Sequence, residues 1–265
     1  MPRAKRELGQ HFLSDPSILR RIVAALNPDR GDVVLEIGSG QGSLTSVLLE
    51  RVDHVIAVER DRDLVPGLRQ DFPSATIIQG DALDLDWHAL ATGRPFLVVG
   101  NIPYQITTPL IDKALTPPRP ARIVFLIQRE VAERLTATPG TKAYGALTIG
   151  VQAMAQVERL FRVPAGAFHP PPQVQSAVVR LTPRREPLVA DRESREFRRL
   201  VVGLFGFRRK QLLRAVRGLT GLPAGPAAEV LERAGVAASI RPEGLAPPDC
   251  VRLFRCLVDG GWWPR

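Results

Sequence analysis

At residues 96–104 the chain reads Phe-Leu-Val-Val-Gly-Asn-Ile-Pro-Tyr, an apolar run that stops abruptly at a Gly-Asn pair. The run is short, partly β-branched and bounded by turn residues, which predicts a buried strand that delivers Asn101 at its carboxyl end. Open α/β sheets bind their ligands at the carboxyl ends of such strands. The stretch therefore predicts an α/β fold with Asn101 at the edge of a binding site.

The residues around this break are suited to holding a flat amine. Asn101 offers an amide oxygen as an acceptor, the carbonyl of Ile102 is a second candidate, and Tyr104 supplies a ring on which a base can stack. Pro103 fixes φ and lacks an N–H, which stiffens the backbone. The alternative is an ordinary strand-to-helix turn, because Asn and Pro are common turn residues. The rest of the chain has to decide between the two.

A glycine turn, Gly38-Ser39-Gly40-Gln41-Gly42, follows an earlier apolar run at residues 33–37. Glycines let the backbone approach a ligand closely. The turn is not a good dinucleotide fingerprint, because Ser43 stands where the third glycine of that motif is expected and Glu36 precedes the turn. A nicotinamide dehydrogenase is therefore disfavoured.

Acidic residues follow the next two predicted strands. One strand ends in Glu59, whose carboxylate can accept both hydroxyls of a ribose, and the other leads through a glycine into Asp81 and Ala82. Asp81 can accept an exocyclic amine, and Ala82 leaves room for a base. With Glu36 and Asn101, these residues recur at intervals of about 20 residues, the length of a βα unit. A lone acidic residue at a strand end is usually a loop residue, but four in register with a glycine turn predict a ligand site.

A sequence of 265 residues, 45% of them apolar, is long enough for one large domain and a smaller one. It has no run of eighteen apolar residues, and its basic beginning leads into Gly9-Gln10-His11 instead of an apolar signal core. We therefore expect a cytoplasmic protein with no membrane partner. The two cysteines and four histidines form no pattern typical of metal ligands, so no metal is expected.

The formal charge of +9 indicates a polyanionic partner. Residues 184–217 contain eleven Lys or Arg and four Asp or Glu, so this segment carries +7 of the total. Arg greatly outnumbers Lys in the chain, which favours bidentate contacts with phosphate. The alternative is a solvated helical face or simple codon bias.

The composition turns polar and proline-bearing at residues 183–187, which predicts a domain boundary. The pattern predicts an α/β domain at residues 1–183 and a small helical domain at residues 184–265. Within the first domain, a stiff proline loop at residues 168–172 presents the ring of Phe168. Three further strands are predicted at residues 123–127, 157–163 and 174–181.

Specific motifs span nearly the whole chain. They are Gly9-Gln10-His11-Phe12-Leu13, Glu36-Ile37-Gly38-Ser39-Gly40-Gln41-Gly42, Gly80-Asp81-Ala82, Asn101-Ile102-Pro103-Tyr104, Phe168-His169-Pro170-Pro171-Pro172-Gln173-Val174 with Ser176, Arg208-Arg209-Lys210 and Arg241-Pro242-Glu243-Gly244-Leu245. With this set, the chain resembles the ribosomal RNA adenine dimethyltransferase family, most closely its bacterial small-subunit branch. The family usually has Asn where this chain has His11, and commonly Asn where it has Gln105.

The resemblance implies a class I, Rossmann-like methyltransferase fold with a seven-stranded mixed sheet, followed by a small all-α C-terminal domain that binds RNA. It implies S-adenosylmethionine as the cofactor, bound by His11, Leu13, Gly38, Glu59, Asp81, Ala82 and Asn101. It implies a transfer centre made of Asn101, Ile102, Pro103, Tyr104 and Phe168, in which the two rings stack on the base. The RNA contacts that it implies are Arg208, Arg209, Lys210 and Arg214.

The implied activity is N6,N6-dimethylation of two adjacent adenosines in a hairpin loop near the 3′ end of small-subunit (16S) ribosomal RNA. The implied substrate is a partly assembled small subunit, and the enzyme is expected to be a monomer. The chemistry agrees with the residues, because an adenine amine is a poor nucleophile and the protein mainly has to position it.

Two other functions are weighed against this one. The macrolide-resistance branch of the family methylates large-subunit RNA, but Arg241-Pro242-Glu243 and Arg208-Arg209-Lys210 favour the small-subunit branch. A non-catalytic ribosome-assembly or RNA-binding factor is disfavoured because the chain keeps four residues of the site: Glu59, Asp81, Asn101 and Tyr104.

Overall fold

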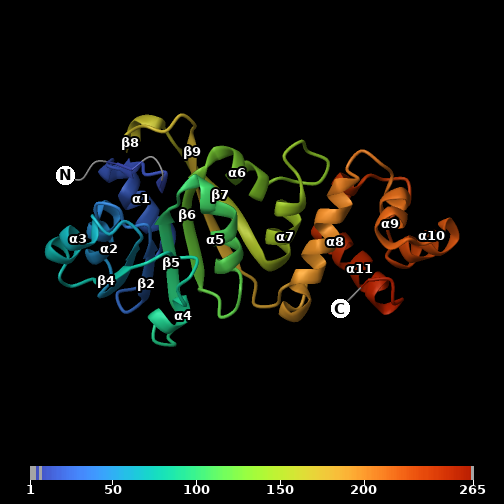
Figure 1. Ribbon diagram of the computed structural model, residues 1–265, viewed down its shortest axis with the longest axis horizontal. Helices are drawn as coiled ribbons and strands as arrows, with labels where there is room; N and C mark the ends of the chain where they lie inside the picture. Colours follow the sequence, from blue (N-terminus) through green and yellow to red (C-terminus); the bar gives the residue numbers. More distant parts are fainter. Residues whose placement is uncertain (1–3, 6–7, 264–265) are drawn as a thin grey trace. The chain divides into compact units, whose positions relative to one another are not determined.

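The computed structural model describes residues 4–5 and 8–263 (Figure 1). The chain folds into two compact units. The first runs to Ala132 and resumes at Val157–Pro183, and the second takes Glu133–Gln156 and continues from Arg184.

The division differs from the single boundary predicted near residue 183, because residues 133–156 leave the α/β unit. The reason lies in packing. Tyr144 and Ile149 are fully buried in the core of the second unit, and the Tyr144 hydroxyl donates to the Leu245 carbonyl at 2.6 Å. The sequence pattern of an apolar helix is the same whichever of two cores the helix packs into, so the pattern alone could not assign residues 133–156 to the second unit.

A seven-stranded mixed sheet forms the first unit, as predicted, with strand order β4-β3-β2-β5-β6-β9-β7. Strands β2 to β6 run parallel where they pair, and β9 pairs antiparallel with β6. The strands are β2 (Val33–Ile37), β3 (His54–Glu59), β4 (Thr76–Gln79), β5 (Phe96–Asn101), β6 (Arg122–Gln128), β7 (Ala155–Val163) and β9 (Ser176–Pro183). The strand order reverses between β2 and β5, which is where open α/β sheets form a binding crevice.

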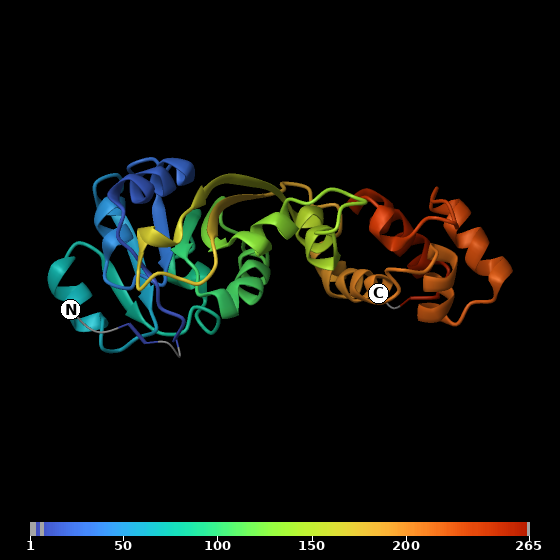
Figure 2. The same ribbon diagram turned by 90° about the horizontal axis from the view of Figure 1, so that it is seen from above.

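Helices cover both faces of this sheet, which explains why its central strands are apolar throughout. In Figure 2, α1 (Pro16–Leu26) lies on one side of the sheet and α5 (Thr107–Ala114) on the other. One core cluster joins α1 and α2 (Ser43–Leu49) to strands β2, β3, β5, β6 and β9. The remaining helices of this unit are α3 (Val65–Asp71), α4 (Trp87–Leu90) and α6 (Arg129–Leu135), the last of which runs across the boundary.

A two-stranded ladder brings distant segments together. Strand β1 (Phe12–Leu13) pairs antiparallel with β8 (Phe168–His169), so that Phe12 lies opposite His169 and Leu13 opposite Phe168. The segment at Phe12 and Leu13 therefore lies beside the proline loop that precedes β9, as the blue and yellow segments in Figure 1 show.

The second unit is helical, as predicted for the end of the chain. Its helices are α7 (Ala146–Met154), α8 (Ser194–Gly206), α9 (Leu212–Thr220), α10 (Ala224–Arg233) and α11 (Pro247–Asp259). They share one apolar core, in which the rings of Phe197 and Phe254 meet edge to face with centroids 5.7 Å apart. In the part of the chain that is described, no helix is long and apolar enough to span a membrane.

Candidate active site

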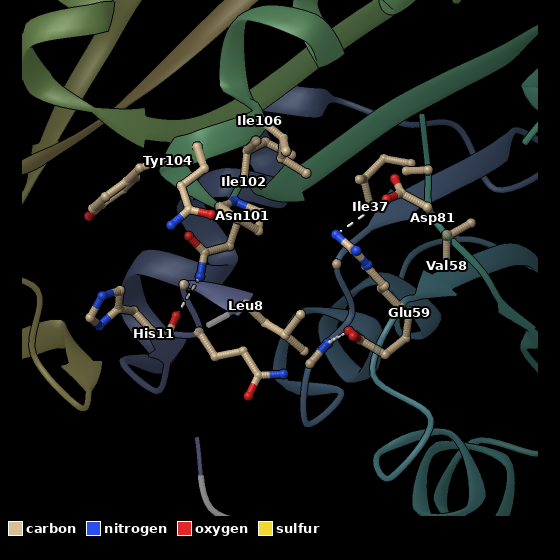
Figure 3. Close-up of a pocket in the computed structure, with 18 of the residues that line it drawn as sticks. Leu8, His11, Ile37, Val58, Glu59, Asp81, Asn101, Ile102, Tyr104 and Ile106 are labelled. Carbon is tan, nitrogen blue, oxygen red and sulfur yellow. Dashed lines mark hydrogen bonds and ion pairs between the residues drawn. The ribbon is translucent and has the colours of Figure 1, made fainter. Parts of the chain in front are cut away.

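A pocket opens at the carboxyl ends of β2, β3, β4 and β5 (Figure 3). Strand register creates it: Ile37 lies opposite both Val58 and Gly100, so that Gly38, Glu59 and Asn101 stand level at the next position. The lining residues are Leu8, Gly9, Gln10, His11, Phe12, Ile37, Gly38, Gly40, Val58, Glu59, Arg60, Gly80, Asp81, Ala82, Asn101, Ile102, Pro103, Tyr104, Gln105 and Ile106.

Glu59 is the buried carboxylate of this pocket, with 6% of its surface exposed. Its two oxygens accept the backbone N–H groups of Gly40 and Asp61, each at 2.7 Å. Gly40 has φ +58°, and a Cβ there would lie 3.0 Å from the ring of Phe12, so a glycine suits the turn. Burial raises the pKa of Glu59, although the two N–H donors oppose the shift. A carboxylate has lone pairs beyond these two bonds and can accept further donors.

Asp81 lies beside Glu59 because Gly80 donates its N–H to the Glu59 carbonyl at 2.9 Å. One Asp81 oxygen accepts the Leu83 N–H at 2.9 Å, and the other lies 3.3 Å from an Arg60 guanidinium nitrogen. The Asp81 side chain is about a quarter exposed, which leaves the carboxylate accessible from the pocket.

Asn101 has a defined orientation. Its amide nitrogen donates to the backbone carbonyl of His11 at 2.7 Å (Figure 3). A carbonyl only accepts, so this bond assigns the nitrogen of the amide and leaves Oδ1 as the acceptor. Next to it, Ile102 is buried and held by an N–H bond to the Leu126 carbonyl at 3.0 Å. The acceptor predicted at the strand end is thus present on a fixed backbone.

The ring of Tyr104 has two neighbours. Its hydroxyl lies 2.8 Å from the Ser176 hydroxyl on β9. The His11 ring lies nearly parallel to it, with centroids 6.0 Å apart and planes inclined by 27°. The His11 Nδ1 donates to the Pro170 carbonyl at 2.8 Å, because the carbonyl can only accept. Two segments far from Tyr104 in sequence therefore fix its surroundings.

Most residues predicted for the site meet in this pocket, and two do not. The residues brought together are His11, Gly38, Glu59, Asp81, Ala82, Asn101, Ile102, Pro103 and Tyr104. Leu13 and Phe168 do not line it: they are 5% and 4% exposed and belong to the core cluster under α1 and α2. Pairing between β1 and β8 places both side chains in that core. The structure thus corrects the expectation that Phe168 presents its ring to the site.

A smaller cavity adjoins the pocket and shares Phe12, Gly38, Gly40 and Asn101 with it. Leu13 and Glu36 line this cavity. Glu36 lies inside β2 and not after it, and side chains alternate along a strand, so it faces away from Ile37. Its carboxylate is 1% exposed and accepts the Thr45 hydroxyl at 2.6 Å, and burial raises its pKa to about 7.

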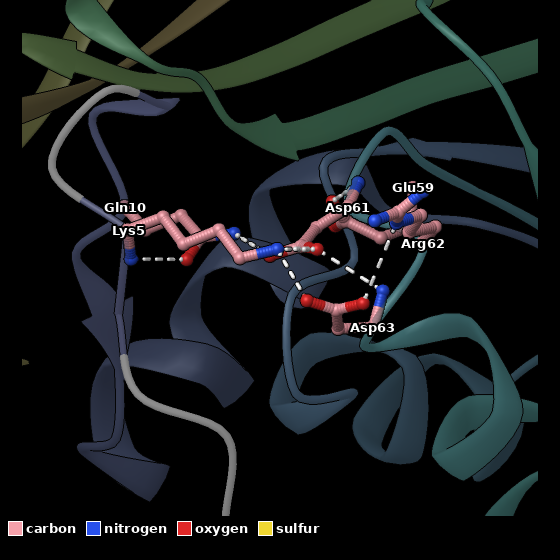
Figure 4. A network of polar contacts seen from close by, with 6 residues as sticks. All are labelled: Lys5, Gln10, Glu59, Asp61, Arg62 and Asp63. Carbon is pink, nitrogen blue, oxygen red and sulfur yellow. Dashed lines mark hydrogen bonds and ion pairs between the residues drawn. The ribbon is translucent and has the colours of Figure 1, made fainter.

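A polar network joins Lys5 and Gln10 to the residues that follow β3 (Figure 4). Lys5 pairs with Asp61 at 2.5 Å and with Asp63 at 2.7 Å, and Gln10 donates to Asp61 at 2.9 Å. Asp61 is 3% exposed and follows Glu59 by two residues. The sequence carries no local signal for this network, because its partners are more than fifty residues apart.

The four basic residues predicted to bind RNA are in different environments. Arg208 pairs with Glu243 at 2.7 Å and donates to the Lys142 carbonyl at 3.0 Å. Arg209, Lys210 and Arg214 are exposed, and among the described residues their side chains have no hydrogen-bonding or ionic partner. Arg208 therefore helps hold its own unit together, and the other three are free to meet a ligand.

Comparison with known proteins identifies relatives of this chain. A family profile described as "Ribosomal RNA adenine dimethylase" matches residues 1–254. "Ribosomal RNA small subunit methyltransferase A" of Synechococcus sp. (strain JA-3-3Ab) is 44% identical over 98% of this chain and 95% of its own length. The protein of the same name from Acinetobacter baylyi is 41% identical over 97% of this chain and 93% of its own length.

Solved structures agree with these sequence relatives. A dimethyladenosine transferase from Plasmodium falciparum superposes with a TM-score of 0.85 at 27% identity, over 96% of this chain and 99% of that one. The 23S rRNA methyltransferase ErmE superposes with a TM-score of 0.73 at 28% identity, over 93% of this chain and 99% of that one.

In the described part of the chain, no group of three or more His, Cys, Asp or Glu could hold a metal ion.

Proposed function

The chain belongs to the ribosomal RNA adenine dimethylase family, and we propose that it methylates two adjacent adenosines of small-subunit ribosomal RNA. It is an S-adenosylmethionine-dependent adenine dimethyltransferase of the class I fold. The observation that carries the proposal is the convergence of Asn101 and Tyr104 with the carboxylates of Glu59 and Asp81 in one pocket.

The lining of the pocket suits S-adenosylmethionine. Two glycines, Gly38 and Gly40, leave one wall without side chains, so a ligand can lie against the backbone. Glu59 offers carboxylate oxygens to ribose hydroxyls, and Asp81 offers them to an adenine amine. Both carboxylates also suit a cationic ligand. When bound, the cofactor supplies an electrophilic methyl group on a sulfonium.

The protein's part in the reaction is to position the amine. Asn101 Oδ1 and the Ile102 carbonyl accept hydrogen bonds from the N6 hydrogens, which favours a pyramidal nitrogen whose lone pair points at the methyl group. The fixed amide of Asn101 is ready for this role, because its nitrogen is already bonded to His11. No strong general base is needed, since the nitrogen becomes acidic once it is cationic.

Stacking holds the base in this arrangement. Tyr104 supplies one ring, and we assign the second to His11, since the ring of Phe168 lies in the core. The 6.0 Å between the His11 and Tyr104 centroids is slightly less than the ~7 Å that a base between two rings needs, twice a contact of about 3.5 Å. A small outward movement of His11 would admit the base.

RNA contacts come from the second unit in this proposal. Arg209, Lys210 and Arg214 present free positive charge, which suits the phosphate backbone. The unpaired bases of a hairpin loop can be turned into a pocket at little cost. The expected substrate is a hairpin of a partly assembled small subunit, modified by a monomer in the cytoplasm.

Nucleoside analysis of ribosomal RNA tests this function. Small and large subunits that lack the modification are incubated separately with the protein and S-adenosylmethionine. We expect N6,N6-dimethyladenosine in small-subunit RNA, preceded by the monomethyl form. Modification of large-subunit RNA alone would favour the activity for which ErmE is named. Methyl groups on cytosine or guanine, or a product that stops at monomethyladenosine, would contradict the proposal.

A further inference from the structure

We propose that Ser176 is a positioning residue for methyl transfer, which acts by fixing the ring of Tyr104 through their two hydroxyls. The inference rests on the proposed function, because it assigns to Tyr104 the stacking of the target base. It adds to the surroundings of the transfer centre a residue of β9, 72 positions after Tyr104 in the sequence.

Ser176 is placed on a rigid part of the sheet. It is the first residue of β9, pairs opposite Gln128 of β6, and has 1% of its surface exposed. The residue before it is also held, because the Gln175 carbonyl accepts the Arg129 N–H at 2.9 Å. The hydroxyl of Ser176 is therefore a fixed point against which a neighbouring side chain can be oriented.

Tyr104 needs such a fixed point. It begins a short 3-10 turn, η2 (Tyr104–Ile106), directly after Pro103, and its ring is only partly buried. The backbone fixes where the side chain starts, but rotation about its side-chain torsions moves the far edge of the ring by several ångströms. The 2.8 Å contact between the two hydroxyls holds that far edge. Burial raises the pKa of Tyr104, so its hydroxyl keeps its proton and stays able to donate.

Ser176 acts through Tyr104 and not on the substrate. It is absent from the pocket lining, whereas Tyr104 is part of it. A serine that merely satisfied the core would have no effect on transfer beyond a change in stability. The two roles are therefore separable by experiment.

A double-mutant cycle tests the proposal with Ser176→Ala, Tyr104→Phe and the double variant. Each single variant removes one hydroxyl of the same bond, and Tyr104→Phe keeps the stacking ring. We expect each to lower kcat for RNA methylation roughly fivefold, the loss of one hydrogen bond, with the double variant no slower than either single one. A less fixed ring should also raise the ratio of monomethyladenosine to dimethyladenosine. The Kd for S-adenosylmethionine should stay unchanged.

Tyr144→Phe is the matched control, since the chain has two tyrosines and the Tyr144 hydroxyl bonds to Leu245 in the core of the second unit. It should lower the melting temperature and leave kcat unchanged. Multiplicative losses in the double variant, or a kcat of Ser176→Ala equal to that of the parent, would overturn the proposal. A parent protein that does not methylate adenosine would instead overturn the proposed function.

Discussion

The pocket of the first unit and the basic segment of the second unit differ in how their residues are held. In the pocket, Glu59 and Asn101 occupy level positions at the ends of paired strands, and each is bonded to backbone. In the basic segment, Arg208 is bonded within its own unit, whereas Arg209 and Lys210 next to it are exposed. Strand topology thus fixes the role of a polar residue in a way that a run of charges in the turn between α8 and α9 does not.

The comparison predicts its largest effect at Asn101. Asn101→Ala removes an acceptor for the reacting amine and the bond to His11, so kcat should fall by about 100-fold to 1000-fold, or ~3–4 kcal/mol in the barrier. Single-turnover methylation of RNA measures it, and the Kd for S-adenosylmethionine, measured by calorimetry, should change only a few-fold. A rate within about tenfold of the parent, which is roughly 1.4 kcal/mol in the barrier, would show that Asn101 only shapes the turn and does not act on the amine.

Glu59 should affect cofactor binding rather than the chemical step. Glu59→Gln weakens charge-assisted bonds to a ribose and to the Gly40 N–H, which are worth about 1.5–3 kcal/mol, so the Kd should rise tenfold or more. Calorimetry with S-adenosylmethionine is the measurement, and Glu50→Gln on the exposed surface is the matched control. An unchanged Kd for Glu59→Gln would show that the Glu59 carboxylate does not bind the cofactor.

The sequence predicted the central sheet and most of the pocket because both follow from local pattern. Apolar runs such as residues 33–37 and 96–99 end in turn residues, and the βα repeat brings their ends together. Glu36 was grouped with the residues that follow the strands, but it lies inside β2. Side chains alternate along a strand, so Glu36 and Ile37 face opposite sides of β2, and this alternation could have been recognised in the sequence.

Contacts between distant segments could not be predicted in the same way. Phe168 sits in a proline loop that suggests exposure, but two-residue strands pair it with Leu13 and turn its ring into the core. Lys5 meets Asp61 through side chains alone. Residues 133–156 carry no change of composition that would assign them to the second core. In each case, the partner is defined only by the folded chain.

The pH dependence of stability at Glu36 reports whether the smaller cavity beside the pocket stays closed to water. Its pKa is raised to about 7 by burial, so the folded state binds a proton that the unfolded chain, with an ordinary pKa of 4.5, has already lost. This contribution to stability is present below pH 4.5 and is lost as the pH rises through 7. Glu36→Gln keeps a partner for Thr45 but does not titrate.

The free energy of unfolding of Glu36→Gln should therefore rise relative to that of the parent between pH 5 and pH 7, by up to about 1.4 kcal/mol per pH unit, and its relative melting temperature should rise with it. Thermal melts of both proteins across this range measure the difference. Parallel curves would mean that the Glu36 carboxylate is hydrated in solution and that the cavity beside it opens.

The smallest effects are expected in the basic segment, where Arg208 and the other three basic residues should behave differently. Replacing Arg209, Lys210 and Arg214 together by Gln should lower the salt slope of RNA binding by about 2, since each phosphate contact contributes roughly 0.7, and should leave the melting temperature unchanged. Arg208→Gln should do the reverse. It loses the half-exposed pair with Glu243 and the bond to Lys142, worth about 1 kcal/mol, and should keep the salt slope of the parent. RNA titrations at several salt concentrations, with melting curves for both variants, separate the two roles. If Arg208→Gln alone flattens the salt dependence, the ion pair with Glu243 opens to admit RNA, and the division between structural and RNA-binding charge within this segment fails.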